Sequence, residues 1–329
     1  MTLVVAAGLL LGLVAYAVFG GADFGTGFWD LTAGGEDRRR TFIGHAIGAV
    51  WEANHVWLIY CLVVLWTAFP GPFAAIMTTL YLPLGLAALG IVLRGSGFAF
   101  REVVSGAGQR RRYGAIFATS SILTPFFLGT VAGGIASGRV PASGHGDAVT
   151  SWVNPSSLLT GAFAVAVCAY LAAVFLTADA RRQETRDLET WFRRRAWGAA
   201  WVTGAVAIAG LPVAHADAPR LFDRLLGAAL PVAVVSVLAG TAALLLLRRA
   251  RPALVRALAA VAVATVVVGW GVAQYPYLLG DHASVAASAA PRATLVALTV
   301  VFVAAGVLVA PSIVLLYVLR QRERVGTSE

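Results

Sequence analysis

The chain has 329 residues, of which 59% are hydrophobic and 12% are charged, and its mean hydropathy is +0.80. A soluble globular chain carries about 25% charged residues, so these values exclude that class and indicate a membrane protein. The formal net charge is +9, and all 25 basic residues are arginines. Because the arginines form short clusters between apolar runs, they indicate membrane orientation and not a surface that binds nucleic acid.

Apolar windows of about 20 residues predict nine transmembrane helices. They cover residues 2–22, 44–69, 72–93, 113–137, 156–179, 196–214, 225–247, 253–275 and 293–319. Glycine and proline residues mark the connections, which are too short to form a domain of their own. The first window lacks a preceding basic region, which favours a retained helix over a cleaved signal peptide. We therefore expect an all-α membrane protein with a single polytopic domain over residues 1–329.

The arginines are divided unequally between the two sets of loops. The odd-numbered loops and the C-terminus hold 21 arginines, among them Arg94 and Arg101, and the even-numbered loops hold four. Short cytoplasmic loops retain positive charge during insertion. The count therefore predicts a multi-pass membrane protein with its N-terminus outside and its C-terminus in the cytoplasm.

A weak internal repeat has an offset of 155 or 156 residues. Its matches are Val18-Phe19 and Ala22-Asp23 with Val174-Phe175 and Ala178-Asp179, and Arg38 to Arg40 with Arg193 to Arg195. The repeat predicts two parallel four-helix bundles, over 1–150 and 151–290, plus one peripheral helix at 293–319. Chance recurrence in a sequence rich in alanine and arginine remains the alternative.

Polar residues inside a membrane span usually serve a function, because lipid disfavours them. In this chain they are Asp23, His45, Glu52, Asn54 and His55. On one continuous helix, His45, Glu52 and His55 would share a stripe, whereas Asn54 would point away and brace a neighbouring helix. Two indoles, Trp51 and Trp57, flank this group and would wall off a narrow polar cavity.

A carboxylate shielded from water can exchange protons near neutral pH. We therefore interpret Glu52 and His55, together with Asp23, as a proton path that opens to the cytoplasm. Two structural alternatives remain open. Glu52 and His55 could fix helix packing through hydrogen bonds, and Asp23 could act as a turn or cap residue beside Gly25 and Gly27.

The same residues bear on cofactors. A haem needs axial ligands inside the bundle, and the candidates are His45, His55 and Met77. Cys61 and Cys168 lie in apolar stretches and suggest core packing. The sequence has no HExxH, CxxCH, Walker A or nucleophile-elbow motif. We therefore expect no haem, no metal site and no catalytic residue in this chain itself.

Two motifs resemble a known family. The sequence GADFGTG at residues 21–27, followed by VWEANHVWLI at residues 50–59, is similar to subunit II of the cytochrome bd-type quinol oxidases. Weaker matches continue along the chain, at Leu93-Arg94 with Phe98, Phe100 and Arg101, at Asn154-Pro155 and at Tyr275-Pro276. Ala99 and His55 depart from the family pattern, in which an acidic residue and Gln or Glu are common.

The resemblance implies a terminal oxidase of the bacterial cell membrane that oxidises quinol and reduces O2 to water. Its turnover would be electrogenic without pumping protons. Its partner would be subunit I, which holds two haems b, one haem d and the quinol site. A small single-helix accessory subunit, and a structural quinone or lipid, are compatible with it. Glu52 takes the position of the family's acidic residue that feeds cytoplasmic protons to the oxygen-reducing haem.

Two other classes of protein remain as alternatives. A secondary transporter or ion channel would line a path with intramembrane acids in both halves, but the second half offers only Asp179. An inert assembly subunit without a proton role fits the composition equally well.

Overall fold

The computed structural model describes residues 1–34, 37–47 and 51–308, with side chains except at 37, 45, 47, 51–53, 102 and 107. The first half contains α1 (Thr2–Ala15), η1 (Tyr16–Gly20), α2 (Gly21–Thr32), α3 (Asp37–Ile47), α4 (Trp51–Ala68), α5 (Pro70–Thr79), α6 (Tyr81–Val103) and α7 (Ala107–Ala136). The second half contains α8 (Pro155–Arg182), α9 (Arg186–Asp217), α10 (Pro219–Leu226), α11 (Leu230–Leu246) and α12 (Pro252–Gln274). A hairpin of β1 (Tyr277–Leu279) and β2 (Ala283–Ser284) and the helix Arg292–Leu308 follow.

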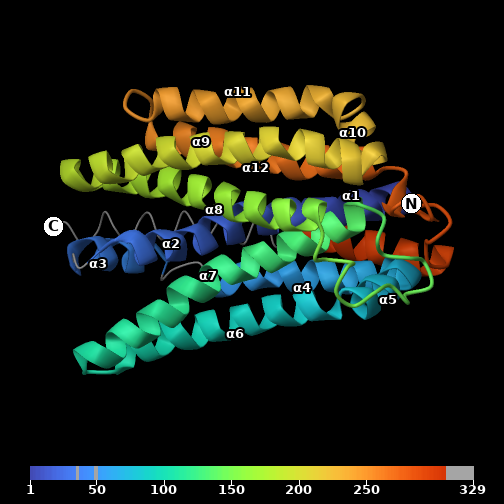
Figure 1. Ribbon diagram of the computed structural model, residues 1–329, viewed down its shortest axis with the longest axis horizontal. Helices are drawn as coiled ribbons and strands as arrows, with labels where there is room; N and C mark the ends of the chain where they lie inside the picture. The colour runs from blue at the N-terminus through green and yellow to red at the C-terminus, as the bar shows by residue number, and fades with distance from the viewer. Residues whose placement is uncertain (35–36, 48–50, 309–329) are drawn as a thin grey trace.

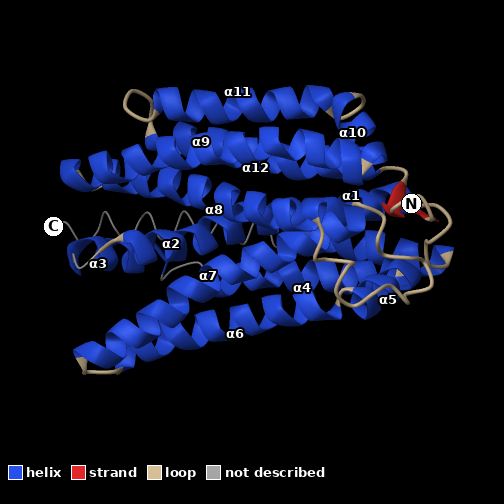
Figure 2. Ribbon diagram, viewed as in Figure 1, coloured by secondary structure: helices blue, strands red, loops and turns tan. Residues whose placement is uncertain are grey.

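The long helices run side by side, and almost all of the regular structure is helical (Figure 1, Figure 2). The turns that join α6 to α7, α8 to α9 and α11 to α12 lie at the left end in Figure 1, and the N-terminus and the β-hairpin lie at the right end. The loops that carry many arginines and the loops that carry few therefore lie at opposite ends of the bundle.

Six helices in the described part are long and apolar enough to cross a membrane, or seven if the bent pair α10 and α11 is one span. The other two predicted spans correspond to shorter apolar helices, Asn54–Ala68 within α4 and Arg292–Leu308. The prediction of an all-helical membrane protein is confirmed, whereas nine spans and two bundles stay predictions.

Three predicted boundaries differ from the structure. The first span does not end at residue 22 but continues through a π-helical turn to Thr32. The predicted span 72–93 is broken at Leu80, because Pro83 cannot donate a backbone hydrogen bond to the Thr79 carbonyl. The glycine-rich stretch from residue 95, interpreted above as a connection, is helical as far as Val103.

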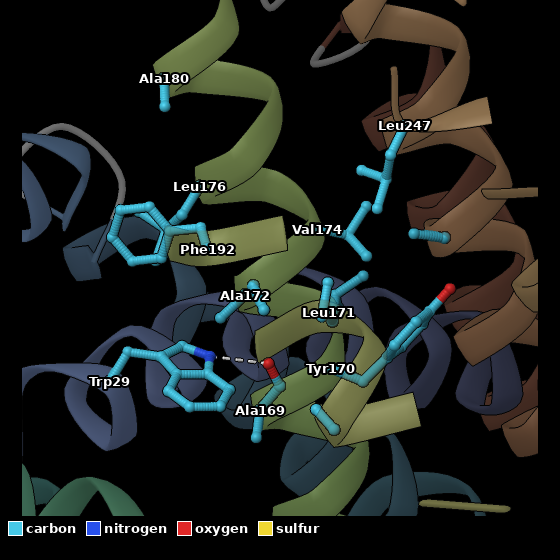
Figure 3. Packing of buried hydrophobic residues seen from close by; sticks show 14 of the residues in the cluster. Trp29, Ala169, Tyr170, Leu171, Ala172, Val174, Leu176, Ala180, Phe192 and Leu247 are labelled. Carbon is cyan, nitrogen blue, oxygen red and sulfur yellow. Dashed lines mark hydrogen bonds between the residues drawn. The ribbon is translucent and has the colours of Figure 1, made fainter. Parts of the chain in front are cut away.

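The α8 helix lies at the centre of the largest hydrophobic cluster, which also includes residues of α2, α9, α11 and α12. Its residues from Ala169 to Val174 are buried without interruption. Figure 3 shows the Trp29 indole of α2 pointing at the backbone of α8, where its Nε1 donates a hydrogen bond of 2.8 Å to the Ala169 carbonyl. This packing fixes α2 against α8 and so positions the polar residues of α2.

Candidate functional site

A buried ion pair joins α2 to α6. The Arg94 side chain is 1% exposed and the Asp23 side chain is 7% exposed, and Arg94 Nη2 lies 2.6 Å from Asp23 Oδ1. The same nitrogen donates a weaker bond of 3.3 Å to the Asp23 carbonyl, and Arg94 Nε donates to Ser121 Oγ at 3.0 Å. The guanidinium also lies over the rings of Phe24 and Phe117, at 5.1 and 4.9 Å.

This geometry corrects two interpretations of the sequence. Asp23 is not a turn or cap residue, because it lies inside a continuous helix and about 14 Å along the axis from Thr32. Arg94 is not a solvated loop residue, because it is helical and buried. Removing Arg94 and Arg101 from the loop arginines leaves the charge asymmetry between the two ends of the bundle intact.

A second ion pair lies seven residues further along both helices. Arg101 Nη1 donates to Asp30 Oδ2 at 2.9 Å, and the Asp30 side chain is 4% exposed whereas that of Arg101 is 26% exposed. Asp30 was missed in the sequence because it lies beyond the predicted end of the first span. The signal that could have found it is the shared spacing of seven, which puts each pair of residues on one helix face.

We call these two ion pairs, Asp23 with Arg94 and Asp30 with Arg101, the aspartate ladder. The second oxygen of each carboxylate, Asp23 Oδ2 and Asp30 Oδ1, is buried and has no hydrogen-bond partner among the described residues. Buried polar atoms in native proteins nearly always have a partner, from the protein or from water. The two oxygens are therefore acceptors, about 10 Å apart along the helix, for further hydrogen bonds.

Two glycines of the first motif allow the ladder to form. A Cβ atom at Gly25 would lie 1.9 Å from the Cys168 carbonyl oxygen, and one at Gly27 would lie 2.2 Å from Ser121 Oγ. Only a glycine fits at such close approaches of helices. The motif at residues 21–27 thus packs α2 against α8 on one side and against α7 on the other, which brings Ser121 to Arg94.

The second motif lies on α4. Asn54 is buried, and His55 is half-buried with its ring 6.5 Å from that of Phe24, the residue that also contacts Arg94. Trp57 stacks on Phe19 at 6.5 Å and packs edge-on against Tyr60. The structure therefore brings His55 beside the ladder, and the prediction that Trp57 walls off a polar cavity is not tested by these contacts.

Three predicted residues lie outside the described side chains, namely His45, Trp51 and Glu52. The backbone places His45 in α3 and Glu52 in the first turn of α4, and residues 48–50 between them are outside the description. The predicted stripe of His45, Glu52 and His55 required a single helix over these residues. It stays a prediction.

The described residues contain no group of three or more His, Cys, Asp and Glu side chains that could hold a metal ion. Cys61 and Cys168 are buried in apolar clusters. Two hollows on the described surface are lined without histidine, cysteine or methionine. The expectation that this chain itself holds no haem stays a prediction.

The fold and the ladder define a polytopic helical membrane protein with paired charges buried between its helices. Residues 1–320 match the family model of cytochrome bd terminal oxidase subunit II, and the chain belongs to this family. It is therefore a subunit of a haem-based terminal quinol:O2 oxidoreductase complex of the bacterial membrane, a complex that includes a partner subunit I.

Two curated relatives carry the same subunit name. The chain is 26% identical over 240 residues to cytochrome bd ubiquinol oxidase subunit 2 of Bacillus subtilis. The aligned region covers 72% of this chain and 69% of the relative. It is 26% identical over 179 residues to cytochrome bd-I ubiquinol oxidase subunit 2 of Escherichia coli K12, covering 51% and 46%.

A solved structure shares the fold. A chain of the bd oxidase from Geobacillus thermodenitrificans superposes with a TM-score of 0.79 at 24% identity, covering 97% of this chain and 98% of that one.

Proposed function

We propose that this subunit supports the haem-bearing subunit I and supplies it with cytoplasmic protons through Glu52, Asp23 and His55. The observation that carries the proposal is the aspartate ladder. Each of its two carboxylates is buried in α2 and has one oxygen without a hydrogen-bond partner among the described residues. Charges are costly in lipid and usually mark ion or proton paths.

The members of the path have different roles in this proposal. Arg94 and Arg101 hold Asp23 and Asp30 in fixed orientations, so each free oxygen accepts hydrogen bonds from bridging water. Glu52 is the group that we expect to take up and release the proton. His55, whose ring lies 6.5 Å from that of Phe24, accepts that proton or orients the water that carries it in this proposal.

Haem chemistry belongs to the partner in this proposal. Two haems b and one haem d in subunit I would carry electrons from quinol to O2, and this chain would hold and move protons only. Because quinol protons are released outside and the protons for water come from the cytoplasm, turnover would be electrogenic without a pump. Nine spans in two parallel bundles with one peripheral helix, an N-terminus outside, and an accessory single-helix subunit complete the proposal.

The transporter or channel alternative has little support. Asp179, the acid that would match Asp23 in the second half, forms ion pairs with Arg256 and with Arg182 near the end of α8. Among the described residues, the second half therefore has no buried acid in the position that corresponds to Asp23.

The first test is the variant Glu52→Gln in the complex with its partner subunit. We expect the rate of O2 reduction to fall about 10- to 100-fold, because the positioned proton carrier is removed, while the haem content stays that of the wild type. The matched control is Glu184→Gln, which makes the same change at an exposed residue after α8. An unchanged rate would contradict the proton role, and a loss of haem would indicate a packing role instead.

A further inference from the structure

A groove between α2, α8 and α9 combines an apolar floor with two arginines at one end. Its volume is about 570 Å³, which is within the range of small-molecule sites. The residues that line it are Phe28, Trp29, Thr32, Ala162, Val165, Ala166, Ala169, Arg194, Arg195, Gly198, Ala199, Val202 and Val206. None of these residues belongs to the aspartate ladder.

The two arginines lie at the arginine-rich end of α9. Arg195 is half-buried, with its guanidinium over the rings of Trp191 and Trp29 at 3.1 and 5.9 Å, whereas Arg194 is exposed. The carboxylates that precede them on α9 already bind other arginines, since Asp187 pairs with Arg38 and Glu189 pairs with Arg193. Arg194 and Arg195 therefore offer positive charge that these acids do not neutralise.

The length of the groove matches one leaflet of a bilayer. From Arg194 to Val206 the α9 helix rises by about 18 Å, and half of a hydrocarbon core measures about 15 Å. Small residues, among them Ala162, Ala166 and Gly198, line the groove along this length and leave its space unfilled by side chains. Within the described part of this chain, no other helix covers α9 at Trp201 and Val202, whose side chains are 75% and 55% exposed.

We propose that this groove binds one anionic phospholipid of the cytoplasmic leaflet. The phosphate headgroup lies at Arg194 and Arg195, and one acyl chain follows the groove between α8 and α9 towards Val206. Charge complementarity supports this occupant, because the cytoplasmic leaflet carries negative lipids that attract juxtamembrane arginines. A zwitterionic lipid would leave the two guanidinium groups without a net negative partner.

The test measures lipid that stays bound to the purified complex. The complex is equilibrated with equal amounts of phosphatidylglycerol and phosphatidylcholine in detergent, and native mass spectrometry counts the lipid adducts. We expect the wild type to retain phosphatidylglycerol preferentially. Arg194→Gln should lower that preference about fivefold, the change expected for removing one arginine from an anionic membrane surface.

A second variant fills the groove without touching its charges. A Cβ atom at Gly198 meets no atom within 4 Å, so Gly198→Leu should fold and should lower phosphatidylglycerol retention by obstructing the acyl chain. The matched control Arg248→Gln removes an exposed arginine from the α11–α12 turn at the same end and should have no effect. Equal retention of both lipids by the wild type, a response to only one of the groove variants, or the same loss in the control would overturn the proposal.

Discussion

The Asp23–Arg94 pair is held where bulk solvent does not screen it. Both side chains are almost fully buried. The guanidinium binds one oxygen of the Asp23 carboxylate, donates to the Ser121 hydroxyl and lies over two aromatic rings. A buried pair contributes little net stability, but loss of one partner leaves an uncompensated charge. Such a pair therefore fixes how α2 and α6 lie against each other more than it adds to the free energy of unfolding.

A double-mutant cycle tests this at the residue scale. Arg94→Met should destabilise the complex by about 3–5 kcal/mol, because the Asp23 carboxylate remains buried without a partner. Adding Asp23→Leu should restore most of that loss, while the rate of O2 reduction stays low. The midpoint temperature of unfolding and the rate are measured on the same samples. A double variant as unstable as the sum of the two single variants would contradict the paired-charge account.

Loss of the Asp30–Arg101 ion pair should destabilise the complex less than loss of the Asp23–Arg94 pair. Arg101 is 26% exposed and so reaches solvent, whereas Asp30 is 4% exposed. Arg101→Met therefore opens a side from which water can reach the Asp30 carboxylate and solvate part of its charge. We expect a destabilisation of about 1–2 kcal/mol, between the values for exposed and buried ion pairs. The same thermal measurement checks it, and a loss equal to that of Arg94→Met would argue against the graded burial of the ladder.

The sequence could reveal one half of this site but not the other. Asp23 and Arg94 were each found, one as an acid in an apolar run and one within a family motif, yet 71 residues separate them and no local pattern links them. Asp30 lay beyond the predicted end of the span. Glycine in a sequence predicts a helix stop, whereas Gly25, Gly27 and Gly97 lie at close contacts between helices in the structure.

At the scale of elements, glycine contacts decide how α2 lies. The α2 backbone approaches α8 so closely at Gly25 that a methyl group there would overlap the Cys168 carbonyl. Gly97 does the same for α6, where a Cβ atom would lie 2.9 Å from the Phe117 nitrogen of α7. These contacts, which join segments far apart in the chain, explain why glycine-rich stretches stay helical here.

Gly25→Ala tests the contact between α2 and α8. The added methyl group must push α2 away from α8, and we expect a loss of about 1–3 kcal/mol in stability, as for overpacked cores. The matched control is Gly85→Ala on α6, where a Cβ atom meets nothing within 4 Å, and this change should be neutral or slightly stabilising. Equal effects of the two changes on the unfolding midpoint of the complex would show that helix propensity, and not close packing, determines the result.

At the scale of the whole molecule, the two ends of the bundle differ in charge as the arginine count predicted. Most arginine-rich turns gather at one end, and the loop between α7 and α8 lies at the other (Figure 1). The arrangement agrees with a cytoplasmic arginine-rich end. The sequence alone could not show which arginines are solvated, since Arg94 and Arg101 point inwards to partners on α2.

Cysteine labelling checks this orientation. Ser143→Cys in the α7–α8 loop should react with a membrane-impermeant maleimide in intact cells, whereas Glu184→Cys should react only after the membrane is opened. The native Cys61 and Cys168 are buried and should give little background. The reverse pattern of labelling would place the arginine-rich end outside.

Proton uptake during one turnover tests the central claim most directly. The reduced complex with its partner subunit is placed in vesicles and mixed with O2, and the charge that crosses the membrane is followed in time. With Glu52→Gln we expect charge movement to slow by at least about tenfold, with Glu184→Gln matching the wild type. Equal charge movement in Glu52→Gln and the wild type would contradict a proton path through this subunit.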